Sequence, residues 1–171
     1  MTVSNATPLI YMAKLGKLQL LKSVFPQIQI PPEVKNETVD RGKEKGYPDA
    51  ISIEQALKDG WITIHPLTEE NNKKSEALAK IAGIDIGEAQ TLILAKQKNE
   101  KLVLTDQTNA RETARQLGLT PRGTIYIILK ATKRKLITKE EAKQTLEKLI
   151  DANFYISAKI YSNTLKAIAK L

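Results

Sequence analysis

Short apolar stretches that alternate with helical patterns constrain the fold of this chain more than any other feature. The segment "KLVLTD", which ends at Asp106, is a continuous apolar run of the kind that is buried in a parallel sheet. Three other strand patterns precede it in "MTVSN", "IQI" and "WITIHPL", with helical spacing between them. This alternation predicts an α/β fold, a three-layer α/β/α sandwich around a mostly parallel central sheet.

Glycine and proline signals divide the helical parts of the chain. A helical segment follows the first strand and is broken near Gly16, and the two prolines after "IQI" start another helix. The charged stretch "DRGKEKGYPD", residues 40–49, is expected to be a loop. In "GLTPRGT" we expect a helix to stop at Gly118 and a tight turn to form at Gly123, with helical patterns from there to the end.

The length of the chain suits one domain. A chain of 171 residues can bury an ordinary core but is too short for two large domains. We therefore expect a single domain over residues 1–171. The C-terminal helices, from about residue 138, are expected to pack on this domain or on a partner.

The composition excludes several kinds of chemistry. Cysteine is absent, which excludes disulfides, thiolate nucleophiles and cysteine zinc sites, and His65 is the only histidine. A structural role is favoured for His65, at the end of a strand pattern, so chemistry would have to use carboxylates. The first residues lack the basic start and apolar core typical of a signal peptide, and no apolar run approaches roughly 18 residues. We expect a cytoplasmic protein without a membrane span.

Positive charge predominates in the chain. Lys and Arg number 27 against 19 Asp and Glu, for a formal charge of +8, which suits a polyanionic partner such as nucleic acid. Basic residues that could line a path for a nucleic-acid backbone are Arg111, Arg115, Arg122, Lys130, Lys133, Arg134 and Lys135. A solvated helix face explains the dense cluster "KATKRK" at least as well.

Oxygen-bearing side chains follow the strand patterns at the places where parallel sheets form sites. Asn5 comes after the first strand, Glu37 lies one turn into the helix after the second, and Asp106 ends "KLVLTD". Glu88 opens the helix that precedes that strand. Carboxylates gathered in this way would repel one another unless a hard divalent cation, Mg²⁺ or Mn²⁺, lies between them.

Each of these acids also has an ordinary explanation. Asp85 and Glu88 have the spacing of a capping box in front of the apolar helix "DIGEAQTLILA". Glu37 suits a solvated helix face, and Asp106 suits a turn. The residues alone leave both interpretations open.

The blocks "VSNATPLIYMAKLGKLQLL", "IPPEVKNETV", "DIGEAQTLILA", "LVLTDQTNAR" and "GLTPRGTIYIILKA" resemble, in this order, those of PIN-domain proteins. The likeness is to a subgroup of predicted nucleic-acid-binding proteins of unknown function, related to VapC-type toxins. It implies an α/β/α sandwich and Mg²⁺- or Mn²⁺-dependent ribonuclease activity from an acidic cluster. The second, third and fourth family acids fall on Glu37, Glu88 and Asp106, whereas Asn5 stands at the position of the first.

The resemblance also implies partners. It predicts an endoribonuclease that acts on RNA, the toxin of a toxin–antitoxin pair with a small antitoxin protein, and a homodimer. The alternative follows from Asn5, which supplies a neutral carbonyl oxygen in place of a carboxylate and so weakens a metal site. On that alternative the chain is a catalytically impaired module that keeps the fold and binds nucleic acid or another protein.

Overall fold

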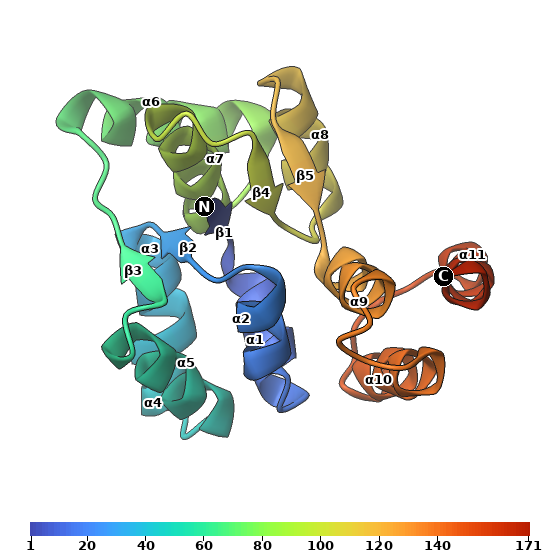
Figure 1. Cartoon of the computed structure of the whole chain (residues 1–171). Coiled ribbons are helices and arrows are strands. Elements are labelled where there is room, and N and C mark those ends of the chain that lie inside the picture. Colours follow the sequence, from blue (N-terminus) through green and yellow to red (C-terminus); the bar gives the residue numbers. More distant parts are fainter.

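A computed structural model describes the whole chain, residues 1–171, and has a parallel sheet at its centre (Figure 1). Five strands pair in the order β3-β2-β1-β4-β5, and every pairing is parallel. The strands are β1 (Thr2–Ser4), β2 (Ile28–Ile30), β3 (Ile62–Ile64), β4 (Leu102–Leu104) and β5 (Thr120–Arg122). The α/β sandwich with a parallel sheet that the sequence predicts is thereby confirmed.

Helices connect the strands and complete the outer layers. Those between β1 and β3 are α1 (Ala6–Lys14), α2 (Leu18–Val24), α3 (Pro32–Lys35), the π-helical segment η1 (Asn36–Asp40), α4 (Arg41–Glu44) and α5 (Pro48–Lys58). Those that follow are α6 (Glu69–Ala82), α7 (Ile86–Gln97), α8 (Thr108–Gln116), α9 (Thr124–Lys133), α10 (Lys139–Asp151) and α11 (Ala158–Lys170).

Two apolar cores lie on opposite faces of the sheet, because successive strand residues point to opposite sides. In β4, Leu104 belongs to the larger core, whereas Val103 belongs to the smaller one. The larger core contains residues of α1, α2, α5 and α9, and the smaller core contains residues of α7 and α8. Val3 of β1 pairs with Val103 in register and lies in the same smaller core. The sheet is thus covered on both faces.

The charged stretch after η1 is helical, so the predicted loop at residues 40–49 is wrong for most of its length. Helix α4 continues directly from η1 and ends before Gly46, whose φ is +70°, and Pro48 then opens α5. Gly42 is buried against α5: a Cβ at this position would lie 2.7 Å from Ala50 Cβ. The charged residues therefore mark the solvated face of a helix whose other face is packed.

Strand β5 was not expected from the sequence, where "GLTPRGT" suggested only a helix stop and a turn. The stop at Gly118 is present, with φ +74°. The next residues form an edge strand, in which Thr105 N–H donates to Arg122 O at 2.7 Å and Thr120 N–H donates to Lys101 O at 2.7 Å. Pro121 cannot donate, which an edge strand tolerates because one side has no partner.

The C-terminal helices pack on α9 and reach the larger core. Leu149 of α10 and Ile168 of α11 are fully buried in that core. The loop between these helices returns to α1, where the rings of Tyr11 and Phe154 meet edge to face with centroids 4.9 Å apart. Tyr11 O–H also donates to Asn153 O at 3.2 Å.

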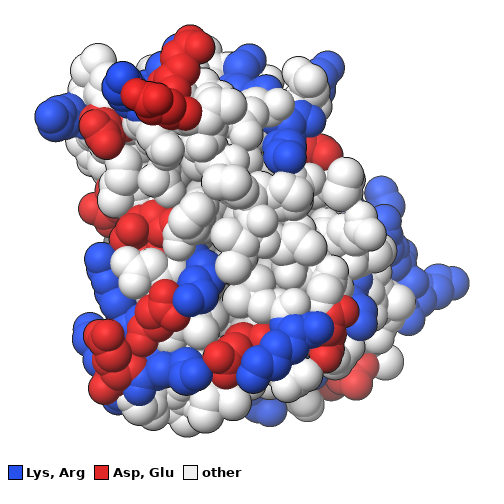
Figure 2. Space-filling model, turned by 90° about the vertical axis from the view of Figure 1, so that its left-hand side faces the viewer, with Lys and Arg blue, Asp and Glu red and all other residues white.

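The surface on the β3 side differs in charge from one part to another. Figure 2 shows charged side chains along its upper and lower margins and a broad uncharged area between them. His65, just after β3, lies beside Thr63, with Nε2 at 3.0 Å from Thr63 Oγ1, in keeping with a structural role.

Among the helices, none combines the length and the apolar character needed to cross a membrane.

Candidate functional site

Asn5 and Asp106 lie at the carboxyl ends of two adjacent central strands. The N–H of Asn5 donates to Leu104 O at 2.8 Å, which joins the residue after β1 to the last residue of β4. Asp106 follows Leu104 by two positions. Both residues therefore occupy the edge at which sites form in parallel sheets.

Asp106 is held by the first residue of α9. Its Oδ1 accepts the Thr124 N–H at 2.7 Å and its Oδ2 accepts the Thr124 hydroxyl at 2.7 Å. Gly123 lies so close that the Cβ of any other residue at that position would overlap Asp106 Oδ1. The φ of Gly123 is −111° and its ψ is −175°, an extended backbone that any residue can adopt. Gly123 is therefore required for space and not for a turn, which corrects the expectation from the sequence.

Glu37 projects from η1 against the start of α7. In a π-helical segment each hydrogen bond spans one residue more than in an α-helix, which changes the direction of the side chains that follow and is common at functional sites. A Cβ at Gly87 would overlap Glu37 Oε1, so the carboxyl group lies directly against the first turn of α7. No hydrogen bond from another residue lowers the pKa of the Glu37 carboxyl group.

Glu88 is both a capping residue and a potential ligand. Its Oε2 accepts the Asp85 N–H at 3.0 Å, the reciprocal half of a capping box at the start of α7. Its Oε1 is buried and has no hydrogen-bond partner, and the residue is only 7% exposed. One oxygen therefore caps α7, and the other has no partner and is available to a ligand. The capping role and the metal-binding role predicted for Glu88 are thus compatible.

Burial and mutual repulsion favour the protonated forms of Glu37 and Glu88. Burial, and after it the charge of Glu33, raises the pKa of Glu37 to about 7. Arg41 lowers this pKa, while Asp85 and Glu88 raise it further. The pKa of Glu88 is also raised, mainly by burial, although the hydrogen bond from the Asp85 N–H lowers it. For Glu37, burial and the neighbouring acids thus outweigh the positive charge of Arg41.

Asp106 lies in a different electrostatic environment. Burial raises its pKa above the ordinary value for aspartate, although the two hydrogen bonds from Thr124 and the positive charge of Arg111 oppose this rise. Arg111 is partly buried, and its Nη1 donates to Thr105 O at 3.1 Å. Its positive charge therefore lies beside the strand end from which Asp106 projects.

The oxygen atoms at this edge are of the kind that binds a hard divalent cation. The side chains that carry them do not converge on one common position. Asn5 Oδ1, Glu88 Oε1 and Thr105 Oγ1 are buried and have no hydrogen-bond partner. Oxygen atoms of carboxylates, amides and hydroxyls are the ligands that Mg²⁺ and Mn²⁺ prefer. No three acidic or histidine side chains form a group that could hold one ion as they stand. Glu37 and Glu88 are electrostatically coupled, while Asp106 is bound to Thr124.

A hollow of about 290 Å³ adjoins the buried carboxyl group of Glu88. It lies between the first turns of α7 and α8, with Asp85 on one side and Gln107 and Thr108 on the other. The Gln107 side chain does not cap α8, so the N–H groups at the start of this helix lack a side-chain acceptor. Helix N-termini favour negative charge nearby, which suits carboxylates and phosphate alike.

Three of the seven predicted basic residues gather next to Asp106. Burial and the charges of Arg115 and Arg122 lower the pKa of Arg111, which places these guanidinium groups near one another. None of the three forms a salt bridge. Arg122 also stacks on Tyr126, with 4.9 Å between the guanidinium carbon and the ring centroid.

The other four basic residues lie near the end of α9 or just after it and have different neighbours. Lys133 is nine residues beyond Thr124, or about 14 Å along a helix. Lys130 Nζ lies over the Phe25 ring at 4.5 Å, and Arg134 Nη1 donates to Val24 O at 3.1 Å, which joins α9 to the end of α2. Lys133 and Lys135 are exposed.

Three residues of the site were not recognised from the sequence. Thr124 binds Asp106, and Gly87 and Gly123 leave the space that Glu37 and Asp106 occupy. The only signals were a glycine before Glu88 and a glycine before Thr124. Both patterns are common in loops and helix starts, so they carry no information without the partner side chain.

Comparison with known families agrees with this geometry. A family model described as a PIN domain matches residues 1–170. No curated protein matches the chain. The family match covers every strand and helix and includes Asn5 and the three acids. PIN domains are associated with nucleic-acid binding, nuclease-type function and divalent metal ions, in keeping with the oxygen atoms at the sheet edge. The chain therefore belongs to the PIN-domain family.

Proposed function

We propose that the protein is a Mg²⁺- or Mn²⁺-dependent endoribonuclease of the PIN type. The observation that carries this proposal is a pair of buried oxygen atoms without hydrogen-bond partners, Asn5 Oδ1 and Glu88 Oε1. They occur at the edge from which Glu37 and Asp106 also project. A buried polar atom without a partner costs about 1–3 kcal/mol, and a bound cation would remove that cost.

Four side chains would hold the ion: Asn5, Glu37, Glu88 and Asp106. When bound, a divalent cation supplies Lewis acidity toward a phosphodiester and acidifies the attacking water. Three carboxylates provide the negative charge that the ion needs. Asn5 provides a neutral oxygen, so the site has one negative charge fewer than a set of four acids and should bind the ion more weakly.

The chain's own residues would orient the RNA and the acids. Thr124 fixes both oxygens of Asp106, so that the carboxylate keeps one direction while RNA binds. Arg111, Arg115 and Arg122 form no salt bridge and would bind phosphate groups beside the cleaved bond. The four basic residues from Lys130 onward would extend this contact along the RNA backbone.

The direct test is cleavage of single-stranded RNA with Mn²⁺, comparing wild type with Glu88→Gln. The variant keeps the shape of the side chain and an acceptor for the Asp85 N–H, but it removes one negative charge. We expect activity to fall by more than roughly 100-fold, because changes even outside the ligand set cost 10–100-fold at metal sites. Glu76→Gln, an exposed carboxylate on α6, is the matched control and should keep full activity. Equal rates for the two variants, or no cleavage by wild type, would contradict the proposal.

The neutral side chain of Asn5 favours a second candidate function. On this alternative the protein is a PIN-fold module that binds nucleic acid or another protein and cleaves no RNA. Calorimetric titration with Mn²⁺ separates this function from the first. Binding of Mn²⁺ that Asp106→Ala abolishes supports the nuclease. RNA binding in the absence of any Mn²⁺ binding supports the module.

The resemblance to VapC-type proteins supports a finer proposal. On this proposal the protein is the toxin of a toxin–antitoxin pair, acts in the cytoplasm as a homodimer and is inhibited by a small antitoxin protein. Expression in a bacterial host gives the test: growth arrest by wild type that Glu88→Gln relieves supports it. Unchanged growth with active, soluble wild-type protein contradicts the toxin role without affecting the nuclease proposal.

A further inference from the structure

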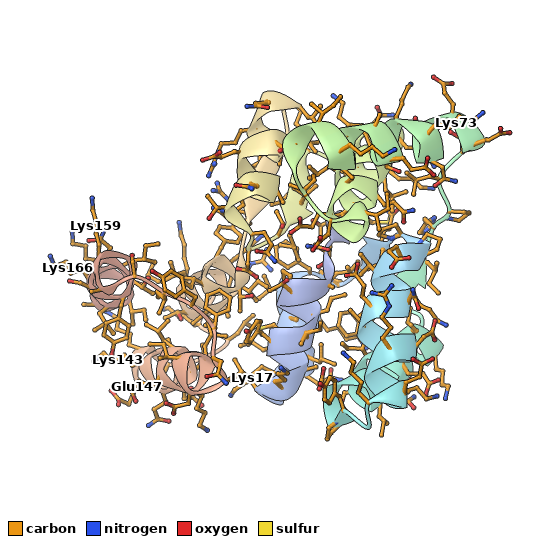
Figure 3. All side chains as sticks on the ribbon, turned by 180° about the vertical axis from the view of Figure 1, so that it is seen from behind. Lys17, Lys73, Lys143, Glu147, Lys159 and Lys166 are labelled. Atoms are coloured by element: carbon orange, nitrogen blue, oxygen red, sulfur yellow. The ribbon has the colours of Figure 1, made fainter.

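A second hollow begins at Glu37 and runs away from the sheet edge. Its volume is about 280 Å³, and it lies between α1 on one side and the helical path of η1 and α4 on the other, with the start of α5 at its far end. Figure 3, which views the molecule from behind, shows α1 and this helical path next to each other. The hollow is therefore continuous with the acidic edge but distinct from the arginine cluster, which lies across Asp106.

Three cationic side chains line this hollow: Lys14, Arg41 and Lys45. Lys14 projects from α1, and the other two are four residues apart and so lie on one face of α4. Arg41 is paired with Glu33 at 3.1 Å, whereas Lys14 and Lys45 form no salt bridge. Both lysines are exposed. Their charge is available to an anionic partner.

The hollow also offers an aromatic face and a buried carboxylate. Tyr47 is 48% exposed although it lines the hollow, and Lys45 Nζ lies 6.0 Å from its ring centroid. Asp49 is only 8% exposed and forms no ion pair, despite the cations nearby. A site for free phosphate would have no use for this carboxylate, but a ribose 2′-hydroxyl can donate a hydrogen bond to it.

The length of the hollow suits a strand of nucleic acid. From Glu37 to Lys45 the helical path covers eight residues, or about 12 Å, against a charge spacing of about 3.4 Å along one strand of a nucleic-acid helix. It therefore spans more than one phosphate. We propose that this hollow binds the single-stranded RNA beyond the cleaved bond: Lys14 and Lys45 bind phosphates, Tyr47 stacks on a base and Asp49 accepts a ribose hydroxyl.

This inference rests on the proposed ribonuclease function only for the direction of the RNA across Glu37. Binding itself is measured without a divalent metal, in EDTA, so that cleavage does not occur. Loss of cleavage in Glu88→Gln with unchanged RNA binding would concern the nuclease alone. Loss of RNA binding in the lysine variants concerns the hollow alone. The two proposals can therefore fail separately.

The main experiment is fluorescence anisotropy with a labelled single-stranded RNA and the double variant Lys14→Gln, Lys45→Gln. The slope of log K against log[salt] is negative, and loss of two phosphate contacts should reduce its magnitude by roughly 1.4, since each contact to a single strand contributes about 0.7. Lys43→Gln is the matched control: it lies on the same helix but pairs with Glu54 at 2.9 Å outside the hollow. Lys159→Gln on α11, far from α1 in Figure 3, is the distant control. If the double variant loses no more affinity or slope than the two controls combined, the proposal is wrong.

A second measurement tests the base and ribose contacts. Trp61, the only tryptophan, is 4% exposed, so Tyr47→Trp introduces a fluorophore whose signal RNA should quench on stacking. Tyr47→Ala should weaken RNA binding at least roughly fivefold, the lower end for one stacked base. Asp49→Ala should reduce the preference for RNA over DNA of the same sequence, while Lys43→Gln leaves that preference unchanged. No quenching, together with equal RNA preference in wild type and Asp49→Ala, would overturn the assignment of these two residues.

Discussion

The two sides of the acidic edge hold the same chemical group in different ways. Asp106 accepts two hydrogen bonds from Thr124 and lies near Arg111, so its position is fixed and the rise of its pKa on burial is partly opposed. Glu37 has no hydrogen bond to another residue, and burial and neighbouring acids raise its pKa to about 7. Each carboxyl group lies against a glycine. The difference suggests that Asp106 is fixed before any ion or RNA binds, whereas Glu37 can still move.

The proposed difference between Asp106 and Glu37 is tested most strongly by adding a methyl group at Gly123. The new Cβ would overlap Asp106 Oδ1, and Asp106 cannot turn away without losing its bonds to Thr124. For Gly123→Ala we expect a roughly 100-fold loss of RNA cleavage, the size expected when a reacting group is misplaced by about 1 Å. Because the backbone there is extended, alanine introduces no strain of its own. The measurement is the cleavage rate with Mn²⁺, alongside circular dichroism to verify folding; a rate near that of wild type in a folded variant would show that Asp106 is not fixed.

The next effect concerns the charge that Asn5 lacks. Asn5→Asp places a fourth carboxylate beside the fixed side of the edge, so we expect Mn²⁺ affinity to rise about tenfold and cleavage to increase. In the absence of metal the variant should be less stable than wild type, because another buried charge is unpaired. Calorimetry with Mn²⁺ and thermal unfolding in EDTA measure the two effects. Unchanged affinity would mean that position 5 does not face the ion.

A smaller effect is expected for Gly87→Ala, the counterpart of Gly123→Ala. The methyl group would overlap Glu37 Oε1, but that atom is the end of a flexible side chain without a fixed partner. Glu37 can rotate, at a cost of order 0.5–1.5 kcal/mol for an unfavourable rotamer, so cleavage should fall only several-fold. A loss as large as that of Gly123→Ala, measured in the same assay, would remove the proposed difference between the two acids.

The smallest effect is on stability and depends on pH. Between about pH 4.5 and pH 7 folded Glu37 binds more protons than unfolded Glu37, so the free energy of unfolding falls as pH rises through this range. Glu37→Gln removes this loss. Without metal, the variant should exceed wild type by about 1 kcal/mol at pH 8, after allowance for solvent screening, and should equal it near pH 4. Thermal unfolding at the two pH values measures this, with Glu76→Gln as a control that should show no such difference.

The sequence was sufficient for most of the sheet because local patterns decide it. Residues 102–104 form a short apolar strand between two helices, and such a run has few alternatives in a chain of this length. It was insufficient for β5, because Pro121 and the two flanking glycines resemble a turn. What makes β5 a strand is the backbone of β4, to which Thr105 and Thr120 bond. That partner is not visible in a local pattern.

The charged segment after η1 is a helix that the local sequence pattern likewise failed to predict. Its composition is that of a loop, but Gly42 allows α4 to pack closely on Ala50 of α5. This packing depends on one buried glycine and on the helix that follows, whereas the composition of the segment is dominated by its exposed charged residues. As a result the hollow lined by Lys14, Lys45 and Tyr47 was not anticipated, since its two walls are separated by some 30 residues of chain.

The sequence by itself determined the α/β class, the chain positions of Asn5, Glu37, Glu88 and Asp106, and the resemblance to PIN domains. These follow from the order of strands, helices and oxygen-bearing residues along the chain. Only the tertiary structure decided how the acids differ. Burial, hydrogen-bond donors and neighbouring charges set the state of a carboxyl group, and they come from residues far apart in sequence, such as Thr124 for Asp106 and Gly87 for Glu37.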